Sequence, residues 1–267
     1  MSTLLASALN RDRWVVLAGL ASLTLLAWAY MVQEARELSL SGMCQCAGMK
    51  MSGPDLHPWS ALSLLALGCM WAEMMVAMML PSATPMILVF ARLNRQRMEN
   101  HQPYVSTAVF VLGYLGAWAG FSALVAAAQW GLHGAALLSP NMVSQSRTLG
   151  AALLMAAGIF QWTPLKHACL RHCRSPLSFL LNDWREGRRG ALIMGLRHGS
   201  YCIGCCWLLM VLLFVAGVMN LWWIGFLTMF VLAEKLAPPA WRLGQVAGVI
   251  LIGWGILMLS GHVLPQG

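Results

Sequence analysis

A row of soft metal ligands recurs every four residues in the last third of the chain. On an α-helix, residues four apart lie one turn above one another on the same face, so this spacing places the side chains in one stripe. Thiolate, thioether and imidazole groups are the ligands that Cu(I) prefers, and that Zn(II) accepts in part. We expect the histidine and the three cysteines to form the main metal site or to carry thiol redox chemistry, although buried cysteines often serve packing alone. The row consists of Met194, His198, Cys202, Cys206 and Met210, with Cys205 beside it.

A second segment is expected to complete this site, because one helix cannot surround a metal ion. It offers Cys69 and Glu73 four residues apart, and Met74 and Met78 in one row. These methionines are equally typical of a packing seam. An ionisable group at membrane depth indicates a function by default, so Glu73 is expected to be a metal ligand, a proton acceptor or the counter-ion of Arg197. We expect the two helices to touch, with a cysteine of the row facing one of the two methionines and with Arg197 facing the bundle interior.

Two further clusters of soft ligands lie outside these helices. The first falls in an expected external loop and predicts either a metal trap or, alternatively, a disulfide or a simple linker. The second falls on an expected amphipathic helix at the opposite face, where the histidine is equally typical of a solvated side chain. The clusters are Met43, Cys44, Cys46, Met49 and Met51, and then Cys169, His172 and Cys173.

The chain is too apolar for an ordinary soluble protein. Of its 267 residues, 59% are hydrophobic and 10% are charged, and the mean hydropathy is +0.68. Apolar stretches of about 20 residues, the length that crosses a bilayer, recur along it. We expect an all-α fold, a polytopic membrane helix bundle of about seven transmembrane helices in a single domain, residues 1–267. The expected spans are about 14–32, 59–90, 104–128, 147–165, 191–219, 221–234 and 243–262.

The basic residues indicate an orientation. Most lysines and arginines fall in segments that share one side of the expected membrane with the N-terminus, and cytoplasmic loops carry such an excess. The N-terminus is therefore expected inside and the C-terminus outside, in a multi-pass protein of the bacterial inner membrane. The net charge of +8 belongs to these loops, and we expect no nucleic acid as a partner.

Three stretches resemble the DUF2182 family, which is described as predicted metal-binding integral membrane proteins. The resemblance covers roughly residues 60–240 and implies a metal and a membrane without a known reaction. It also draws attention to Lys166 and to Glu234-Lys235, a pair that by position alone indicates a helix-end ion pair. Glu73 and residues 43–51 are not part of the motifs. The motifs are Trp71-x-x-Met74-x-x-Ala77-Met78-Met79-x-Pro81, Gln161-x-Thr163-Pro164-Leu165-Lys166 with Cys169 and Cys173 after it, and Cys202-x-Gly204-Cys205-Cys206-Trp207.

These patterns predict a Cu(I)-binding membrane protein, with zinc as the alternative metal. We expect it to act in copper transport, in copper delivery or in metalloenzyme assembly. Its expected partners are the lipid bilayer and a periplasmic or cytoplasmic metallochaperone or a membrane metalloenzyme. A membrane thiol–disulfide electron carrier is the first alternative, since Cys202 and Cys205 have the spacing used for exchange. A structural subunit of a membrane complex is the second. The sequence shows no nucleotide-binding loop, aspartyl-phosphate motif or hydrolase triad, so we do not expect an ATP-driven pump. We favour a protein that is not an enzyme, with the thiol–disulfide carrier as the enzyme-class alternative.

Overall fold

All the regular structure in the described part of the chain is helical, as expected. The computed structural model describes residues 2–46, 61–100, 103–134 and 147–260, and in the first helix it describes side chains from Arg13 to Glu37. The helices are α1 (Ser2–Cys46), α2 (Ala61–Glu99), α3 (Thr107–Gly134), α4 (Arg147–Phe160), α5 (Pro164–Arg174), α6 (Pro176–Asp183), α7 (Gly187–Val211), α8 (Leu213–Ala216), α9 (Leu221–Leu236), the 3-10 turn η1 (Pro239–Trp241) and α10 (Leu243–Leu259).

Within the described residues, four helical segments are long and apolar enough to cross a membrane: Arg13–Glu37, Ser63–Glu99, Thr107–Gly131 and Gly187–Ala216. A fifth candidate is α4 with α5, which are bent by 63° at their junction. The remaining apolar helices, α9 with 16 residues and α10 with 17, are shorter than the roughly 20 residues that a full crossing needs. Length alone therefore supports four or five spans where seven were expected.

Several element bounds differ from the expected spans. Helix α1 continues to Cys46, beyond the expected end near residue 32, and the fourth expected span stops at Phe160 before the bend. The fifth ends as a helix at Val211, and α8 continues it as far as Ala216. Pro164 at the start of α5 explains the break at the α4–α5 junction, because proline lacks the N–H that would continue α4.

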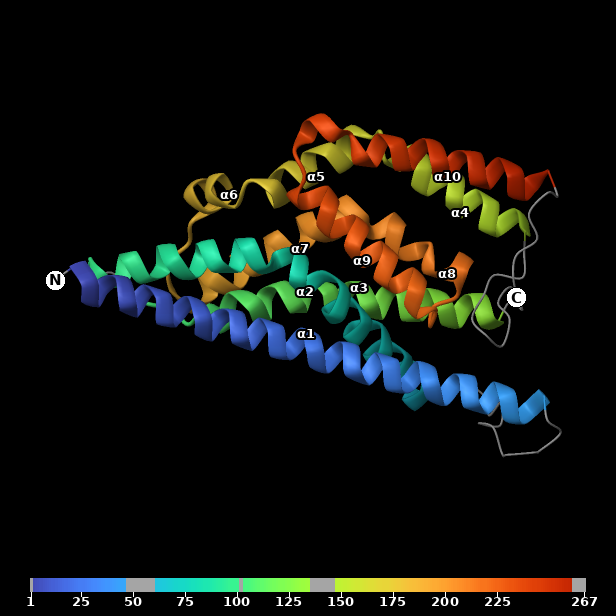
Figure 1. Cartoon of the computed structure of the whole chain (residues 1–267), viewed down its shortest axis with the longest axis horizontal. Helices are drawn as coiled ribbons and strands as arrows, with labels where there is room; N and C mark the ends of the chain where they lie inside the picture. Colours follow the sequence, from blue (N-terminus) through green and yellow to red (C-terminus); the bar gives the residue numbers. More distant parts are fainter. Residues whose placement is uncertain (1, 47–60, 101–102, 135–146, 261–267) are drawn as a thin grey trace.

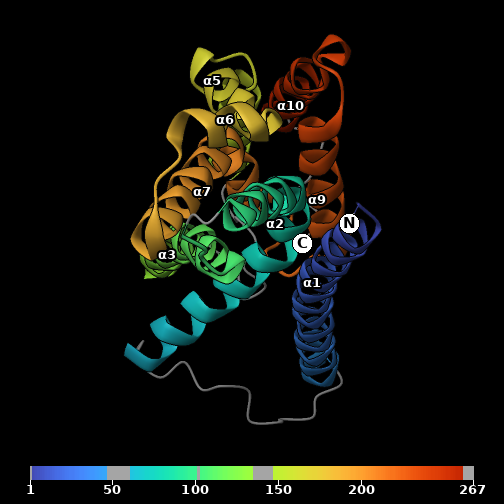
Figure 2. The same cartoon turned by 90° about the vertical axis from the view of Figure 1, so that its left-hand side faces the viewer.

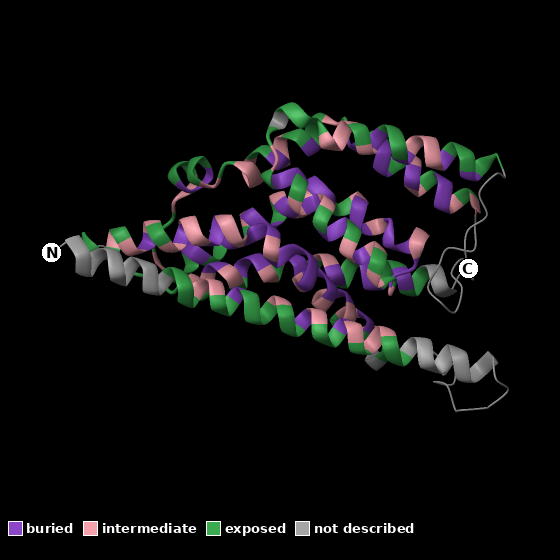
Figure 3. Cartoon of the chain, viewed as in Figure 1, coloured by how far each residue is buried: buried purple, intermediate pink, exposed green. Residues whose placement is uncertain are grey.

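Helix α2 lies in the middle of the bundle, with α3, α7 and α9 around it (Figure 2). Helix α7 packs mainly on α3 and α5, and α2 packs mainly on α1 and α3. Helices α4 and α10 pair with each other along the upper edge of Figure 1. Buried residues concentrate on α2 and α7, whereas much of α1 is exposed (Figure 3). The core of the molecule is therefore the region between α2, α3 and α7.

Two prolines shape α2 without ending it. Pro81 and Pro85 lie inside the helix, and Figure 1 shows α2 changing direction in its middle. Because Pro81 has no N–H, it leaves the carbonyl of Ala77 without its helical partner. Trp28 of α1 donates its indole N–H to that carbonyl, at 3.1 Å. The carbonyl that Pro81 leaves free is thus hydrogen-bonded by a neighbouring helix.

Glycines bring α3 and α7 close together. A Cβ added at Gly195 would collide with the carbonyl oxygen of Phe110, and one added at Gly113 would collide with that of Leu192. Small residues allow this approach of two backbones. At Gly120, farther along α3, an added Cβ has no atom within 4 Å. The crossing fixes α7 in the centre of the core.

Candidate metal site

The whole soft-ligand row of α7 is buried. None of its six side chains exposes more than 2% of its surface, as the structure places Met194, His198, Cys202, Cys205, Cys206 and Met210. The helical spacing that predicted one continuous stripe is therefore matched by one continuous buried face.

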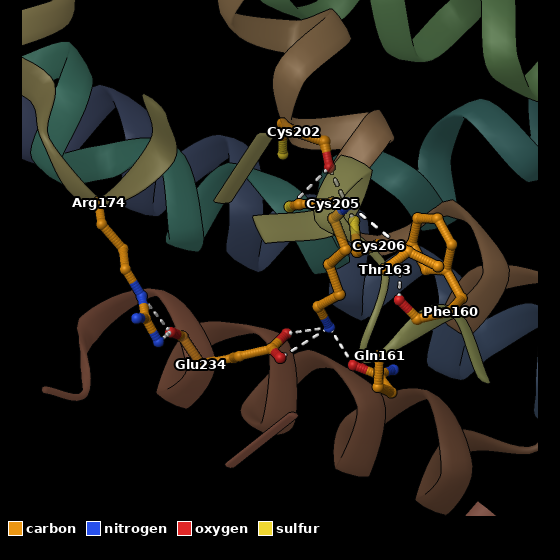
Figure 4. A network of polar contacts seen from close by, with 9 residues as sticks. Phe160, Gln161, Thr163, Arg174, Cys202, Cys205, Cys206 and Glu234 are labelled. Atoms are coloured by element: carbon orange, nitrogen blue, oxygen red, sulfur yellow. Dashed lines mark hydrogen bonds and ion pairs between the residues drawn. The ribbon is translucent and has the colours of Figure 1, made fainter. Parts of the chain in front are cut away.

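Three thiols of α7 converge on one turn of the helix. The thiols of Cys205 and Cys206 each donate to the backbone carbonyl of Cys202, at 3.0 Å. Figure 4 shows the three cysteines together, with dashed lines from the Cys202 carbonyl to the other two thiols. The thiols of Cys205 and Cys206 are thus turned inward and occupied by hydrogen bonds within their own helix.

Helix α5 brings further thiols to this turn. Cys173 interacts through its side chain with Cys202 and Cys205. Cys169 packs on α7 where Gly204 leaves space, because a Cβ at Gly204 would lie 2.7 Å from the Cys169 sulfur. The four thiols of Cys173, Cys202, Cys205 and Cys206 form what we call the thiol cluster.

The Cys202 sulfur is contacted by a buried lysine and a buried tyrosine. Lys235 of α9 donates to it at 3.0 Å, and the hydroxyl of Tyr114 lies 3.2 Å from it. Lys235 also donates to the Ser82 hydroxyl at 2.8 Å, and Tyr114 donates to the Met79 carbonyl at 3.1 Å. A buried ammonium group is costly unless it is partnered, so its placement on a sulfur is a specific feature of this site.

The residue before Lys235 points to a different partner. Glu234 forms an ion pair with Lys166 at 2.7 Å, and their side chains expose 3% and 1% of their surface. Lys166 also donates to the side-chain oxygen of Gln161. Arg174 donates to the Glu234 backbone carbonyl at 2.9 Å, as Figure 4 shows. Two residues expected to pair with each other therefore form separate contacts, because neighbours on a helix project in different directions.

His198 lies in an aromatic pocket one turn before Cys202. Its ring stacks near those of Phe110, Tyr114 and Phe179, with centroids 5.7–6.3 Å away. Within the described residues its Nδ1 atom has no hydrogen-bond partner. His172 of α5, by contrast, stacks on Tyr201 with centroids 4.1 Å apart and contacts the Ala168 carbonyl. His172 is thus accounted for by local packing.

The candidates on α2 separate into two groups. Met74 and Met78 are buried in the core, whereas Cys69 is exposed. Glu73 is partly buried on the side of α1, where Glu34 and Tyr30 are its ionisable neighbours. The atoms of α2 that reach the cluster network are the Met79 carbonyl and the Ser82 hydroxyl. The contact of Cys202 or Cys206 with Met74 or Met78 stays a prediction.

Two expectations for charged residues are wrong. Arg197 does not turn into the core: its side chain is 40% exposed and pairs with Asp183 of α6 at 2.6 Å. Asp183 is therefore its counter-ion, and Glu73 is not. The cation next to Cys202 is Lys235.

The cluster is not arranged as a finished cage. In the ranges that the structure describes, no group of three or more His, Cys, Asp or Glu side chains is already placed to hold a metal ion. The turned-in thiols of Cys205 and Cys206 explain this, since each is bonded to a carbonyl. To bind a metal ion here, these thiols must rotate away from the carbonyl, or two thiols alone must serve as the ligands. The candidates Met49 and Met51, and the side chains of Met43, Cys44 and Cys46, lie outside the described residues.

Sequence reasoning missed two site residues, Tyr114 and Ser82. It also did not predict that Lys235 contacts the Cys202 sulfur. By position Lys235 indicated a helix-end ion pair, and the family resemblance alone drew attention to it as a site residue. Tyr114 and Ser82 carry no ligand signal of their own, because hydroxyl groups on apolar helices are common and their role depends on neighbours distant in sequence.

Comparison with known protein families matches residues 68–258 to PpoB2, described as a copper chaperone. No curated protein and no solved structure matches the chain. The expected relation to DUF2182 is confirmed, because this family is its equivalent. The match spans most of the chain, including α2, α5, α7 and α9, which carry the described contacts of the site. The chain belongs to the PpoB2 copper chaperone family.

Proposed function

We propose that the protein binds Cu(I) at the thiol cluster and passes it to a partner protein. The observation that carries the proposal is the convergence of Cys202, Cys205 and Cys173 from two helices, with the Lys235 ammonium on the Cys202 sulfur. Thiolates select Cu(I) among the common metals. A buried cluster of this kind keeps the ion away from water.

The charges favour Cu(I) as the cargo. One Cu(I) held by two thiolates has one negative charge, which the Lys235 ammonium neutralises in a region where an unpaired charge is costly. Structural Zn(II) takes four ligands in a tetrahedron. Among the described residues no three-ligand group stands ready for such a shell. Zinc is therefore the second choice.

The closed state of the cluster suits a chaperone. The thiols of Cys205 and Cys206 are bonded to the Cys202 carbonyl, so loading replaces these hydrogen bonds and release restores them. Because each such bond contributes only about 1 kcal/mol, the exchange between loaded and free states has a low cost. A protein that delivers copper needs this property.

The membrane arrangement belongs to the same proposal. Four or five helices in the described part of the chain are long enough to cross a bilayer. Helices α9 and α10 would complete seven spans if the bilayer thins around them, as short helices require. We place the N-terminus inside and the C-terminus outside the bacterial inner membrane, following the basic loops. The partner is a metallochaperone on either side or a membrane cuproenzyme.

Copper titration of the purified protein tests the proposal. Detergent-solubilised protein is loaded anaerobically with Cu(I) against a competing chelator, and bound copper is measured. The wild type is expected to bind copper, and the Cys202/Cys205/Cys206→Ser variant to lose it. Cys69→Ser is the matched control, since Cys69 is exposed on α2. Equal copper content in the wild type and the triple variant would reject the thiol cluster as the site.

The thiol–disulfide carrier remains the second candidate, favoured by the approach of Cys173 to Cys202 and Cys205 across two helices. Disulfide formation needs two thiols whose Cβ atoms lie close. Alkylation mapping after mild oxidation separates the two functions. A Cys173 disulfide that forms and reduces reversibly, in a protein without copper, supports the carrier; thiols protected by Cu(I) support the chaperone.

A further inference from the structure

The half of the α7 row before the thiol cluster is not used by the proposed copper site. Met194 and His198 are both buried and lie on the same face as Cys202. Successive members are one turn apart, which is about 6 Å of helix rise. The two side chains therefore extend the soft-ligand stripe from the cluster toward the start of α7.

His198 has an open ligand position. Its Nδ1 atom is without a hydrogen-bond partner in the described part of the chain, although the residue exposes only 2% of its surface. A buried nitrogen left unpaired costs roughly 1–3 kcal/mol. His198 is also near enough to Cys202 and Cys205 to interact with them electrostatically. An imidazole nitrogen in this state is available to a soft metal ion.

Met194 connects His198 to a small pocket at the end of the molecule. The pocket lies between the ends of α2 and α7 and is lined by Met194, Trp184, Arg97 and Glu186, among other residues. The Met194 sulfur accepts the backbone N–H of Arg185, at 3.4 Å. The thioether therefore stands at the inner wall of this pocket.

The mouth of the pocket is closed by contacts that open easily. Arg97 pairs with Glu186 at 2.6 Å, but their side chains are 29% and 66% exposed. The Arg97 guanidinium also lies over the Trp184 ring, 4.8 Å from its centroid. An exposed ion pair contributes at most about 1 kcal/mol. The pair neutralises Arg97, and the exposed residue Arg185 also lines the pocket. A copper ion that enters here therefore passes beside one further arginine.

We infer that Met194 and His198 form a transit site for Cu(I), through which the ion passes between the thiol cluster and the pocket beside Trp184. Each step of the path exchanges one soft ligand for the next. No bond is oxidised or reduced, and the ion stays Cu(I) throughout. The inference rests on the proposed function and adds a route to it.

Transfer kinetics test this route. Wild type and variants, purified in detergent and loaded anaerobically with one equivalent of Cu(I), are mixed with bathocuproine disulfonate in a stopped-flow instrument. Met194→Leu and His198→Phe are expected to keep the equilibrium copper content. Their rates of loading and release should fall by about tenfold, the effect of a barrier higher by about 1.4 kcal/mol. Met86→Leu, another buried methionine, should change neither rate.

The outcomes separate the two proposals. A wild type that binds no copper rejects the proposed function together with the route. A wild type that binds copper, with unchanged rates in both variants, overturns only the route. Faster release with weaker binding in His198→Phe would make His198 a ligand of the resting site and would also overturn it. His198→Gln serves as a second variant if the phenylalanine disturbs folding, which thermal unfolding checks.

Discussion

Two buried lysines make contacts at the last turn of α9, Lys166 from α5 and Lys235 from α9 itself, and their partners differ. Lys166 is paired with the carboxylate of Glu234 and the amide of Gln161. Lys235 contacts the Cys202 sulfur and the Ser82 hydroxyl. Glu234 and Lys235 are neighbours in the chain, so one turn of α9 supports both arrangements.

The different partners of Lys166 and Lys235 indicate which region stabilises the fold and which supports metal binding. A lysine matched by a carboxylate is a fixed ion pair that holds α5 against α9. A lysine on a thiol stabilises the charge of a potential metal ligand, because a cation next to sulfur favours the thiolate. The comparison predicts that the first region governs stability and that the second governs copper binding.

The largest expected effect is on stability, from Lys166→Met. This change leaves the Glu234 carboxylate buried without its ion-pair partner, and breaking such a pair costs about 3–5 kcal/mol. Unfolding of the detergent-solubilised variant by denaturant titration measures the loss. The double variant Lys166→Met/Glu234→Gln should recover much of it. If Lys166→Met is as stable as the wild type, the Lys166–Glu234 ion pair does not stabilise the fold.

The next effect is on copper affinity, from Lys235→Met. Groups that contact a metal ligand from outside typically contribute about 10–100-fold to affinity, so Cu(I) binding should weaken by that range. Competition with a chelator gives the value. The Lys166→Met variant, at a temperature where it stays folded, should retain the Cu(I) affinity of the wild type. That result would separate the roles of the two lysines. Equal affinity losses in both lysine variants would erase the distinction.

A smaller effect is expected from Tyr114→Phe. The change removes one hydrogen-bonding group from the Cys202 sulfur while keeping the ring that packs beside His198. One hydrogen bond is worth about 1 kcal/mol, or roughly fivefold in affinity. The same chelator competition measures it. A loss as large as that of Lys235→Met would place the hydroxyl, and not the cation, as the main support of Cys202.

The smallest effect is expected from Arg197→Gln. Its ion pair with Asp183 is partly exposed, and such pairs contribute less than about 1 kcal/mol. Both stability and copper affinity should stay close to those of the wild type. A clear loss of copper binding in this variant would restore the idea that Arg197 acts on the cysteines.

The soft-ligand face of α7 could be predicted from the sequence because it depends on local periodicity alone. Its spacing of four is a property of one helix, and the structure buries the whole row. The kink of α2 was predictable for the same reason, since Pro81 acts on its own helix. Spacing on the expected amphipathic helix also marked Cys169 and Cys173, which lie at or near the cluster. The family motifs added Lys166, the ion-pair partner of Glu234.

The contacts between helices could not be predicted in this way. Lys235 is 33 residues from Cys202, and no local pattern shows which side of α9 it faces. Arg197 lies within the row in sequence, directly before His198, yet its position on the helix turns it toward Asp183. The count of spans also depends on where helices break, as at Phe160, and single-helix patterns do not resolve a bend of that kind.

X-ray absorption at the copper edge tests the central claim most directly. Protein loaded with one equivalent of Cu(I) is compared with Cys202→Ser and with Cys69→Ser. We predict a first shell of sulfur alone in the wild type and in Cys69→Ser, with fewer sulfur neighbours or no copper in Cys202→Ser. A nitrogen or oxygen shell in the wild type, or a spectrum that Cys202→Ser leaves unchanged, would contradict the thiol cluster as the copper site.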